Sequence, residues 1–144
     1  MVDPGAEVQS GGQPRLSAED RAQIEELLSV YVLSLDVDET ETTVALFTED
    51  GEFRVYDRAF TGHDGLRRMF TSAPKGLHLG GRSVITATVD GAAVRQQLVF
   101  YPADRGEQRL AVYDDVVAKA DGRWLFRSRD CRFMDRDGVL RSRP

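Results

Sequence analysis

Two side chains far apart in the sequence, Asp36 and His78, could together carry out proton-transfer chemistry. An imidazole titrates near neutral pH, and a carboxylate bonded to one ring nitrogen leaves the other free to act as a base. Asp36 falls near the predicted C-terminal end of a helix, where the dipole disfavours an anion by about 0.3 to 1 kcal/mol. That position suits either a functional carboxylate or a solvated residue at a junction. The pair is a catalytic candidate only if folding brings both residues into one pocket.

Other polar residues have simpler structural interpretations. Asp38, with Glu41 three residues later, is predicted to cap a second, short helix. His63 lies in a turn, which favours a solvated residue over a catalytic one. Cys131 has no second cysteine for a disulfide or a metal-ligand pair, so we interpret it as an apolar filler on a strand. One plausible imidazole and scattered carboxylates predict no metal site, and we expect no cofactor.

Composition limits the class of protein. The chain has 144 residues, of which 41% are hydrophobic and 30% charged, and this fits one globular domain with a single core. Its net charge of −5 argues against binding to a nucleic-acid backbone. No apolar run approaches the roughly 20 residues that span a bilayer, and the N-terminus lacks the pattern of a signal peptide. These features and the single cysteine predict a cytoplasmic protein with no nucleic-acid or membrane partner.

The first long apolar stripe must position Asp36. Residues 1–15 are rich in glycine and proline and are predicted to form a disordered arm before the domain. Ser17 and Asp20 then form a capping pattern. The apolar residues that follow recur at three- and four-residue steps, which predicts a helix ending near Asp36. They are Ile24, Leu27, Leu28, Tyr31 and Leu35.

The second half of the domain, which holds His78, is predicted to contain only strands. A short hairpin and a two-turn helix stopped by Pro74 precede it. Helices at the front and a strongly curved antiparallel or mixed sheet at the back give an α+β domain, with three helices across the concave face and a cone-shaped interior. The domain is predicted to span residues 16–135, with a tail at 136–144. The four long strands are expected at 78–89, 92–102, 107–120 and 123–133, joined by hairpin turns.

The polar lining of this cone depends on which residues of each strand point inward. A polar residue in step with large apolar ones is a candidate for contact with a substrate. Gly80 and Gly81 could form a bulge, and a bulge would exchange the inward-facing and outward-facing side chains for the rest of that strand. The sequence therefore leaves open which set of alternate residues faces the interior. The candidates from the strands are Arg82, Gln96, Asp114 and Arg129.

Several short motifs, in their order along the chain, carry a resemblance to a known group of proteins. They are Tyr31 with Leu35-Asp36 at the helix end, LFTEDGEF at 46–53, TGHDGL at 61–66, HLGG at 78–81 and DGRWLF at 121–126. Their order and spacing resemble the SnoaL-like group of the NTF2-like superfamily over about residues 16–133. The resemblance implies a cone-shaped α+β fold with a deep apolar cavity, often assembled into dimers or trimers through the sheet.

The resemblance also implies roles for individual residues. Members similar to scytalone dehydratase and hexachlorocyclohexane dehydrochlorinase use an aspartate after the first helix and a histidine at the start of a long strand as a dyad. These positions match Asp36 and His78. The chain departs from the scytalone dehydratase pattern by lacking a second histidine on a later strand and by carrying Leu35 where a tyrosine precedes the aspartate. Tyr31 and Tyr56 are the tyrosines expected to contact a substrate.

Two functions fit these features. The first is a small-molecule lyase or isomerase, dehydratase- or cyclase-like, in which Asp36 orients His78 as general base on an apolar carbonyl-bearing or aromatic metabolite in an internal cavity. The second is a non-catalytic ligand-binding or subunit-associating domain, because a fold does not determine function. Contact between the two residues at an enclosed cavity would favour the first function. Exposure of His78 at a sheet edge would favour the second. We expect a homo-oligomer, a dimer or a trimer.

Overall fold

The computed structural model describes residues 13–134 and residue 140. The predicted arm at 1–15 lies outside these residues as far as residue 12, and the predicted tail at 136–144 lies outside them apart from residue 140. The elements follow the order α1 (Ala18–Asp36), α2 (Thr40–Val44), β1 (Phe47–Val55), β2 (Arg58–Thr61), α3 (Gly62–Ser72), β3 (Gly76–Thr88), β4 (Gly91–Pro102), β5 (Arg109–Ala120) and β6 (Arg123–Phe133).

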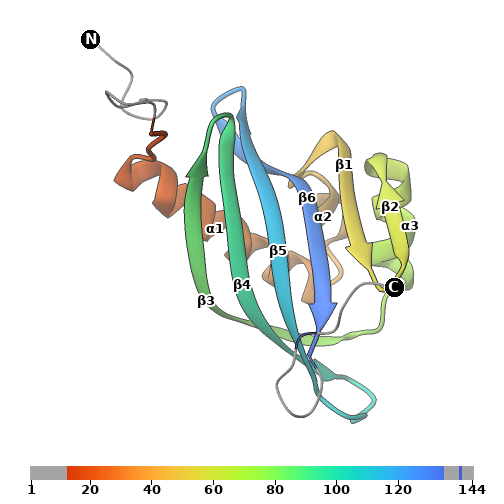
Figure 1. Cartoon of the computed structure of the whole chain (residues 1–144). Coiled ribbons are helices and arrows are strands. Elements are labelled where there is room, and N and C mark those ends of the chain that lie inside the picture. Colours follow the sequence, from red (N-terminus) through yellow and green to blue (C-terminus); the bar gives the residue numbers. More distant parts are fainter. Residues whose placement is uncertain (1–12, 135–139, 141–144) are drawn as a thin grey trace.

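The strands form one curved sheet in the order β2-β1-β6-β5-β4-β3, with the helices packed on one face (Figure 1). Strands β3 to β6 pair antiparallel with their sequence neighbours, which confirms the predicted meander. β1 pairs antiparallel with β2 and parallel with β6, so the sheet is mixed. The α+β class and the helix-covered sheet are therefore as predicted. Among the described residues no helix is both long and apolar enough to cross a bilayer.

The start of α1 is held by a capping contact and by the last strand. Oγ of Ser17 accepts a hydrogen bond of 3.0 Å from the backbone N–H of Asp20, as the sequence pattern predicted. Oδ1 of Asp20 accepts one of 2.9 Å from the indole N–H of Trp124 and one of 3.2 Å from Nζ of Lys119. Burial alone would raise the pKa of Asp20, but its hydrogen bonds leave that pKa below its ordinary value.

The end of α1 is closed by a Schellman motif. The N–H of Glu39 bonds the carbonyl of Ser34 at 2.9 Å, and the N–H of Asp38 bonds that of Leu35 at 3.3 Å. Asp38 has a φ of 60°, a conformation that short polar residues and glycine tolerate best. The predicted capping of the second helix by Asp38 is therefore wrong. Glu39 stands at that N-cap and makes no side-chain capping bond.

The ring of Tyr31 occupies the centre of the core. It meets four aromatic rings edge-on, at centroid distances between 5.7 and 6.3 Å. Edge-to-face pairs of this kind each add about 0.5 to 1.5 kcal/mol beyond the area that they bury. The four rings belong to Phe47, Phe70, Tyr113 and Phe126, so α1 is joined through one side chain to β1, α3, β5 and β6.

Of the three register shifts among the described strands, two change which residues of β3 and β6 face the core. On β3 the register with β4 shifts between Gly80 and Ser83. Between β5 and β6 it shifts between Val116 and Val117, and the extra residue is on β6. As a result Phe126 and Arg129, three positions apart, are both fully buried.

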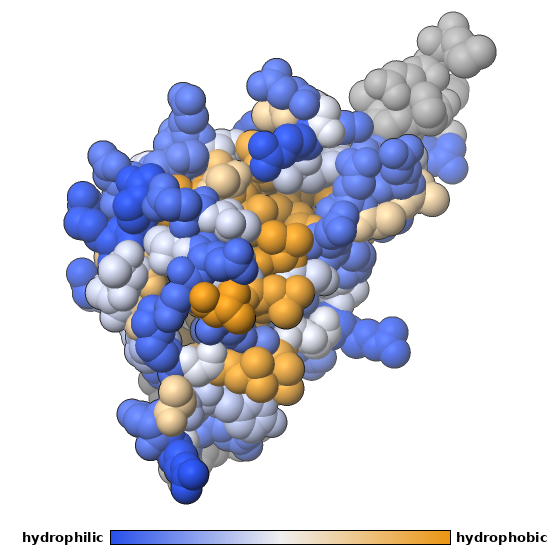
Figure 2. Space-filling model, turned by 180° about the vertical axis from the view of Figure 1, so that it is seen from behind, coloured by the Kyte–Doolittle hydropathy of each residue, from blue (hydrophilic) through white to orange (hydrophobic). Residues whose placement is uncertain are grey.

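The face of the molecule on which α1 lies also carries exposed apolar side chains. Figure 2 shows them gathered near the middle of the face that is turned away in Figure 1. On α1 and directly after it, Leu33 is 66% exposed and Val37 is 62% exposed. On the edge strand β3, Leu77 and Leu79 alternate with the inward-facing His78, so they point to the other side of the sheet, where each is about half exposed. Exposed apolar side chains in such numbers are a common feature of protein–protein contacts.

Candidate active site

The structure brings Asp36 and His78 into direct contact. Oδ1 of Asp36 lies 2.5 Å from Nδ1 of His78, and Oδ2 accepts a hydrogen bond of 2.7 Å from the backbone N–H of the same histidine. Only 12% of the Asp36 side chain and 15% of the His78 side chain are exposed. Because an ionised carboxylate can only accept hydrogen bonds, it holds the proton of the neutral ring on Nδ1. Nε2 is then the basic nitrogen.

The ends of two elements keep this pair in place. Asp36 is the last residue of α1, whose last turn has no basic residue to offset the carboxylate. The hydrogen bonds from His78 supply that compensation from another element. β3 is an edge strand, so a side chain of α1 can reach its backbone. An ion pair of 2.5 Å between Lys75 and Asp38 links the end of α1 to the start of β3 a second time.

His78 lies on the wall of a cavity of about 290 Å³ between the helices and the sheet. Asp36 is not on this wall, so its carboxylate orients the imidazole without contacting a ligand in the cavity. The ring of His78 rests against that of Phe100, with centroids 4.5 Å apart. The rest of the wall is mostly apolar, including Leu35, Phe53, Phe60, Phe70, Leu98 and Phe133. A cavity of this kind suits an apolar ligand with few polar groups.

Tyr31 and Tyr113 add two phenol groups to the cavity wall, from α1 and β5. Their ring centroids lie 5.8 Å apart. Burial raises the pKa of both phenols, so both stay protonated. The two phenols are hydrogen-bonded to one another, which leaves one O–H of the pair for a ligand. The guanidinium of Arg129 lies 4.3 Å from the ring centroid of Tyr31 and 3.8 Å from that of Tyr113, and its charge opposes the rise in pKa.

Two of the predicted substrate contacts, Arg129 and Gln96, lie behind the cavity wall. Arg129 donates hydrogen bonds of 2.8 and 2.9 Å to Asp115 and one of 3.3 Å to Gln96. Burial raises the pKa of Asp115, and the charge of Arg129 opposes that rise. None of these three residues is on the wall of the cavity. Their structural effect is to hold a cation under the rings of Tyr31 and Tyr113.

Tyr56 and Arg82, also predicted to contact a substrate, lie in different surroundings. Tyr56 is on the wall of the cavity and 54% exposed, in the turn between β1 and β2, and its hydroxyl accepts a hydrogen bond from Arg109. Arg82 is exposed and is not on the wall. Arg82 lies in the bulge between Gly80 and Ser83. The bulge interrupts the alternation in which every second residue from His78 faces the interior, so Arg82 does not face inward.

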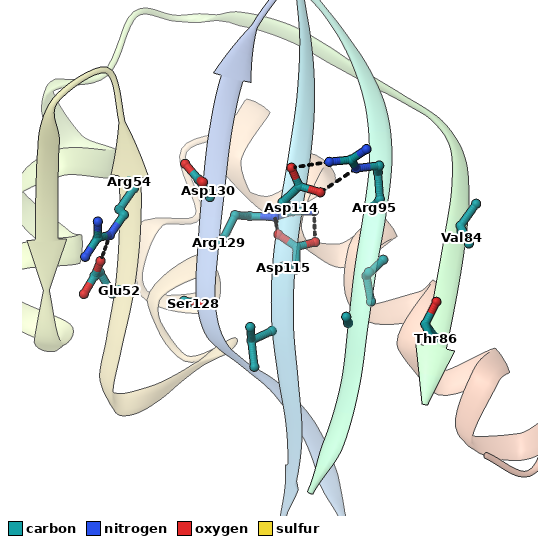
Figure 3. A pocket seen from close by; sticks show the side chains of 13 residues that line it. Glu52, Arg54, Val84, Thr86, Arg95, Asp114, Asp115, Ser128, Arg129 and Asp130 are labelled. Atoms are coloured by element: carbon teal, nitrogen blue, oxygen red, sulfur yellow. Dashed lines mark hydrogen bonds and ion pairs between the residues drawn. The ribbon is translucent and has the colours of Figure 1, made fainter. Parts of the chain in front are cut away.

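Asp114, the remaining predicted contact, lines a wider hollow of about 940 Å³ on the sheet face away from the helices (Figure 3). Its carboxylate accepts hydrogen bonds of 2.6 and 3.1 Å from Arg95. In the same hollow Glu52 is paired with Arg54. Because these charges neutralise one another in pairs, the hollow offers less reactive chemistry than the cavity at His78.

Sequence reasoning did not single out Tyr113. On its strand both sets of alternate residues contain apolar side chains, so periodicity gave no reason to prefer Tyr113 over Asp114. Cys131 is buried on the cavity wall, as an apolar filler would be. Burial raises the pKa of its thiol to about 12, which makes it a poor nucleophile.

His63, predicted to be solvated, is partly buried in the first turn of α3. Its Nε2 lies 3.0 Å from the carbonyl oxygen of Phe47, so the ring links α3 to β1. The prediction that it is solvated is therefore wrong, although it is not on the cavity wall. Within the described residues no three His, Cys, Asp or Glu side chains gather as a group that could hold a metal ion.

Comparison with known sequences identifies the family. Residues 16–130, most of the chain, match the family model of the SnoaL-like domain. The chain belongs to the SnoaL-like family. This agrees with the resemblance seen in the sequence motifs. No curated protein matches this SnoaL-like chain.

Solved structures share the SnoaL-like fold at low sequence identity. A protein of unknown function with a cystatin-like fold from Nostoc punctiforme is 24% identical, with a TM-score of 0.77 over 85% of this chain and 96% of that chain. A type 2 hexachlorocyclohexane dehydrochlorinase (LinA) is 17% identical, with a TM-score of 0.70 over 81% and 89%. ActVI-ORFA from Streptomyces coelicolor is 21% identical, with a TM-score of 0.67 over 78% and 96%. These similarities establish the fold.

Proposed function

We propose that this SnoaL-like protein is a lyase or isomerase, dehydratase- or cyclase-like, that acts without a cofactor on an apolar carbonyl-bearing or aromatic metabolite. The observation that carries the proposal is the 2.5 Å contact between Asp36 and His78, with the imidazole on the wall of an apolar cavity. A domain that only binds a ligand has no need of an oriented base at that wall. Dehydrochlorination, in the name of one structural neighbour, is chemistry of the same general kind.

In the proposed reaction, Nε2 of His78 takes a proton from a carbon beside a carbonyl group, and the electron pair of that C–H bond moves toward the carbonyl oxygen. The enolate then has three outcomes. In an elimination, the enolate expels a leaving group from the β-carbon, and the leaving group takes the proton of the imidazolium. In an isomerisation, the imidazolium returns its proton to a different carbon of the enolate. In a cyclisation the enolate bonds to a second carbonyl, and the imidazolium protonates the new alkoxide. Each route returns His78 to its neutral form.

The two buried phenols suit the other half of this reaction. Negative charge develops on the carbonyl oxygen as the proton leaves, and a hydrogen-bond donor fixed in an apolar site stabilises it by about 3 to 4 kcal/mol. Tyr31 and Tyr113 are hydrogen-bonded to one another on the cavity wall, so the pair has one O–H left to donate to a ligand. We therefore assign them to the carbonyl oxygen, and Tyr56 to a contact near the opening. Arg129 influences the substrate only through the rings of Tyr31 and Tyr113, against which its guanidinium lies, and Gln96 accepts a hydrogen bond from that guanidinium.

The test is hydrogen exchange on a simple aryl ketone. The protein should speed deuterium incorporation at the α-carbon of 1-tetralone in D2O, followed by proton NMR. Substituting His78→Ala or Asp36→Asn should slow that exchange by about 10²- to 10⁴-fold. His63→Gln is the matched control, because it removes the other imidazole away from the cavity wall. Equal exchange by the wild type and His78→Ala would reject the proposal in favour of a non-catalytic binding domain.

We propose in addition that the protein works in the cytoplasm as a homo-oligomer, a dimer or a trimer. The exposed apolar residues at the end of α1 and on the edge strand β3 support self-association, because burying them removes apolar surface from water. Light scattering should give two or three times the monomer mass at micromolar concentration. A monomer under those conditions would reject the proposed assembly.

A further inference from the structure

The cavity at His78 has a charge opposite to that of the chain. Its wall includes two arginines, Arg58 and Arg109, and no aspartate or glutamate of the described residues lines it. The whole chain has 24 Asp and Glu against 19 Lys and Arg. A cavity whose only formal charges are cationic, in an acidic chain, attracts a ligand of negative charge.

Building on the proposed function, we propose that the substrate carries an oxyanion group, a carboxylate or a phosphate, which Arg58 and Arg109 bind at the mouth of the cavity. The apolar body of the substrate then lies along the wall, and its reacting carbon lies against His78. This assigns a substrate class, an apolar or aromatic organic anion, that His78 and Asp36 alone do not specify.

Arg109 lies in the same cross-strand row of the sheet as His78. His78 is paired with Phe100 across β3 and β4, and Phe100 is paired with Arg109 across β4 and β5. Two strand spacings place the backbones of His78 and Arg109 about 10 Å apart. The ring of Phe100 lies on the wall between them. A fused two-ring body with a short acidic side chain spans such a distance.

The two guanidinium groups are held by aromatic rings and not by carboxylates. Arg109 lies 3.9 Å from the ring centroid of Phe133 and donates a hydrogen bond to Tyr56. Arg58 lies 5.0 Å from the ring centroid of Phe60. An aromatic face orients a guanidinium while leaving most of its N–H donors free for an oxyanion.

Several other arginines of the chain are paired with carboxylates. Arg54, Arg67 and Arg95 each form an ion pair with a carboxylate. No carboxylate of the described residues forms an ion pair with Arg58 or Arg109. Arg58 and Arg109 therefore combine a position on the cavity wall with a charge that no carboxylate of the described residues pairs with.

The experiment compares two probes of the same shape, 3-(2-naphthyl)propanoate and its amide, by calorimetry with the full chain. The wild type should bind the carboxylate about tenfold more tightly than the amide at low salt. Arg58→Gln and Arg109→Gln should each weaken carboxylate binding by about threefold to tenfold and leave amide binding unchanged. Arg95→Gln is the matched control, because it removes the same charge from the other face of the sheet. 2-Naphthyl phosphate, titrated in parallel, shows whether carboxylate or phosphate fits better.

Three results would overturn the proposal. They are equal binding of the carboxylate and the amide by the wild type, a carboxylate preference that survives both substitutions, and an equal loss in Arg95→Gln. If a variant fails to fold, salt titration of the wild type decides the question. Added salt should reduce the preference for the carboxylate, and a preference that salt does not change would contradict an ionic site.

His78→Ala separates this proposal from the proposed catalytic function. The variant should lose α-hydrogen exchange and keep the carboxylate preference, because the imidazole lies on β3 and the arginines on β2 and β5. Exchange that survives His78→Ala rejects the catalytic role alone. Loss of the carboxylate preference in Arg58→Gln and Arg109→Gln still supports the anion site in that case.

Discussion

Replacing Asp36 by asparagine should reverse the tautomer of His78. Asp36 accepts one hydrogen bond from the backbone N–H of His78, at 2.7 Å, and one from Nδ1 of its ring, at 2.5 Å. An asparagine side chain offers one accepting oxygen and one donating NH2 group. The backbone N–H can only donate, so it takes the oxygen, and the NH2 group then faces Nδ1. Nδ1 must become an acceptor, and the ring proton moves to Nε2.

A proton on Nε2 removes the base from the cavity. General base catalysis by a positioned side chain contributes about 10²- to 10⁴-fold, so turnover by Asp36→Asn should fall by that factor. The loss corresponds to about 3 to 5 kcal/mol of activation free energy. The free energy of unfolding should change by less than about 2 kcal/mol, because both hydrogen-bonding positions remain occupied.

Nitrogen-15 NMR of the imidazole rings measures the tautomer without a substrate. The chain has two histidines, and His63 serves as an internal reference. Its Nε2 lies 3.0 Å from the carbonyl oxygen of Phe47, which can only accept, so neutral His63 carries its proton on Nε2. In the wild type the two rings should therefore be opposite tautomers. In Asp36→Asn, His78 should change and His63 should not. A His78 tautomer unaffected by the substitution would refute the reasoning, even if activity fell.

Three further predictions concern stability and reactivity. Asp20→Asn should lower the free energy of unfolding by about 2 to 3 kcal/mol, measured in urea through the fluorescence of Trp124, the one tryptophan of the chain. Because the pKa of Asp20 is lowered in the folded state, the ionised form carries this stabilisation, and the difference from the wild type should vanish as the pH falls through that pKa. Arg129→Met should cost about 3 to 5 kcal/mol, since it leaves the Asp115 carboxyl buried without its partner; adding Asp115→Leu should recover part of the loss, and additive losses would contradict the pairing. Burial raises the pKa of Cys131 to about 12, so iodoacetamide should modify this thiol only in denaturant, and rapid labelling of the native protein would show that the thiol is reactive.

Local patterns in the sequence predicted most of the elements. The capping of α1 by Ser17, its apolar stripe and the turns between the long strands involve residues close together in the chain, so a short window contains the interacting partners. Asp38 is a position at which the local sequence pattern gave the wrong structural role. An aspartate suits both an N-cap and the left-handed position of a Schellman motif, and the observed φ of 60° shows that it closes α1.

The composition of the site depended on contacts between distant strands. Gly80 and Gly81 showed where a bulge was possible on β3, but whether a bulge forms depends on how a strand pairs with its neighbour. Only that pairing decided that Arg82 leaves the inner face and that Arg129 joins Phe126 inside it. The same holds for the charge of the cavity wall, whose arginines come from β2 and β5.

The sequence by itself determined the reactive groups and the elements that carry them, including an aspartate at a helix end and a histidine at a strand start. Tertiary structure alone decided that these two residues, 42 positions apart, form one hydrogen-bonded pair. It also decided that phenols and guanidinium groups share their cavity. The physical reason is that helices and turns close through neighbouring residues, whereas a cavity is closed by side chains that meet only when helix and sheet pack together.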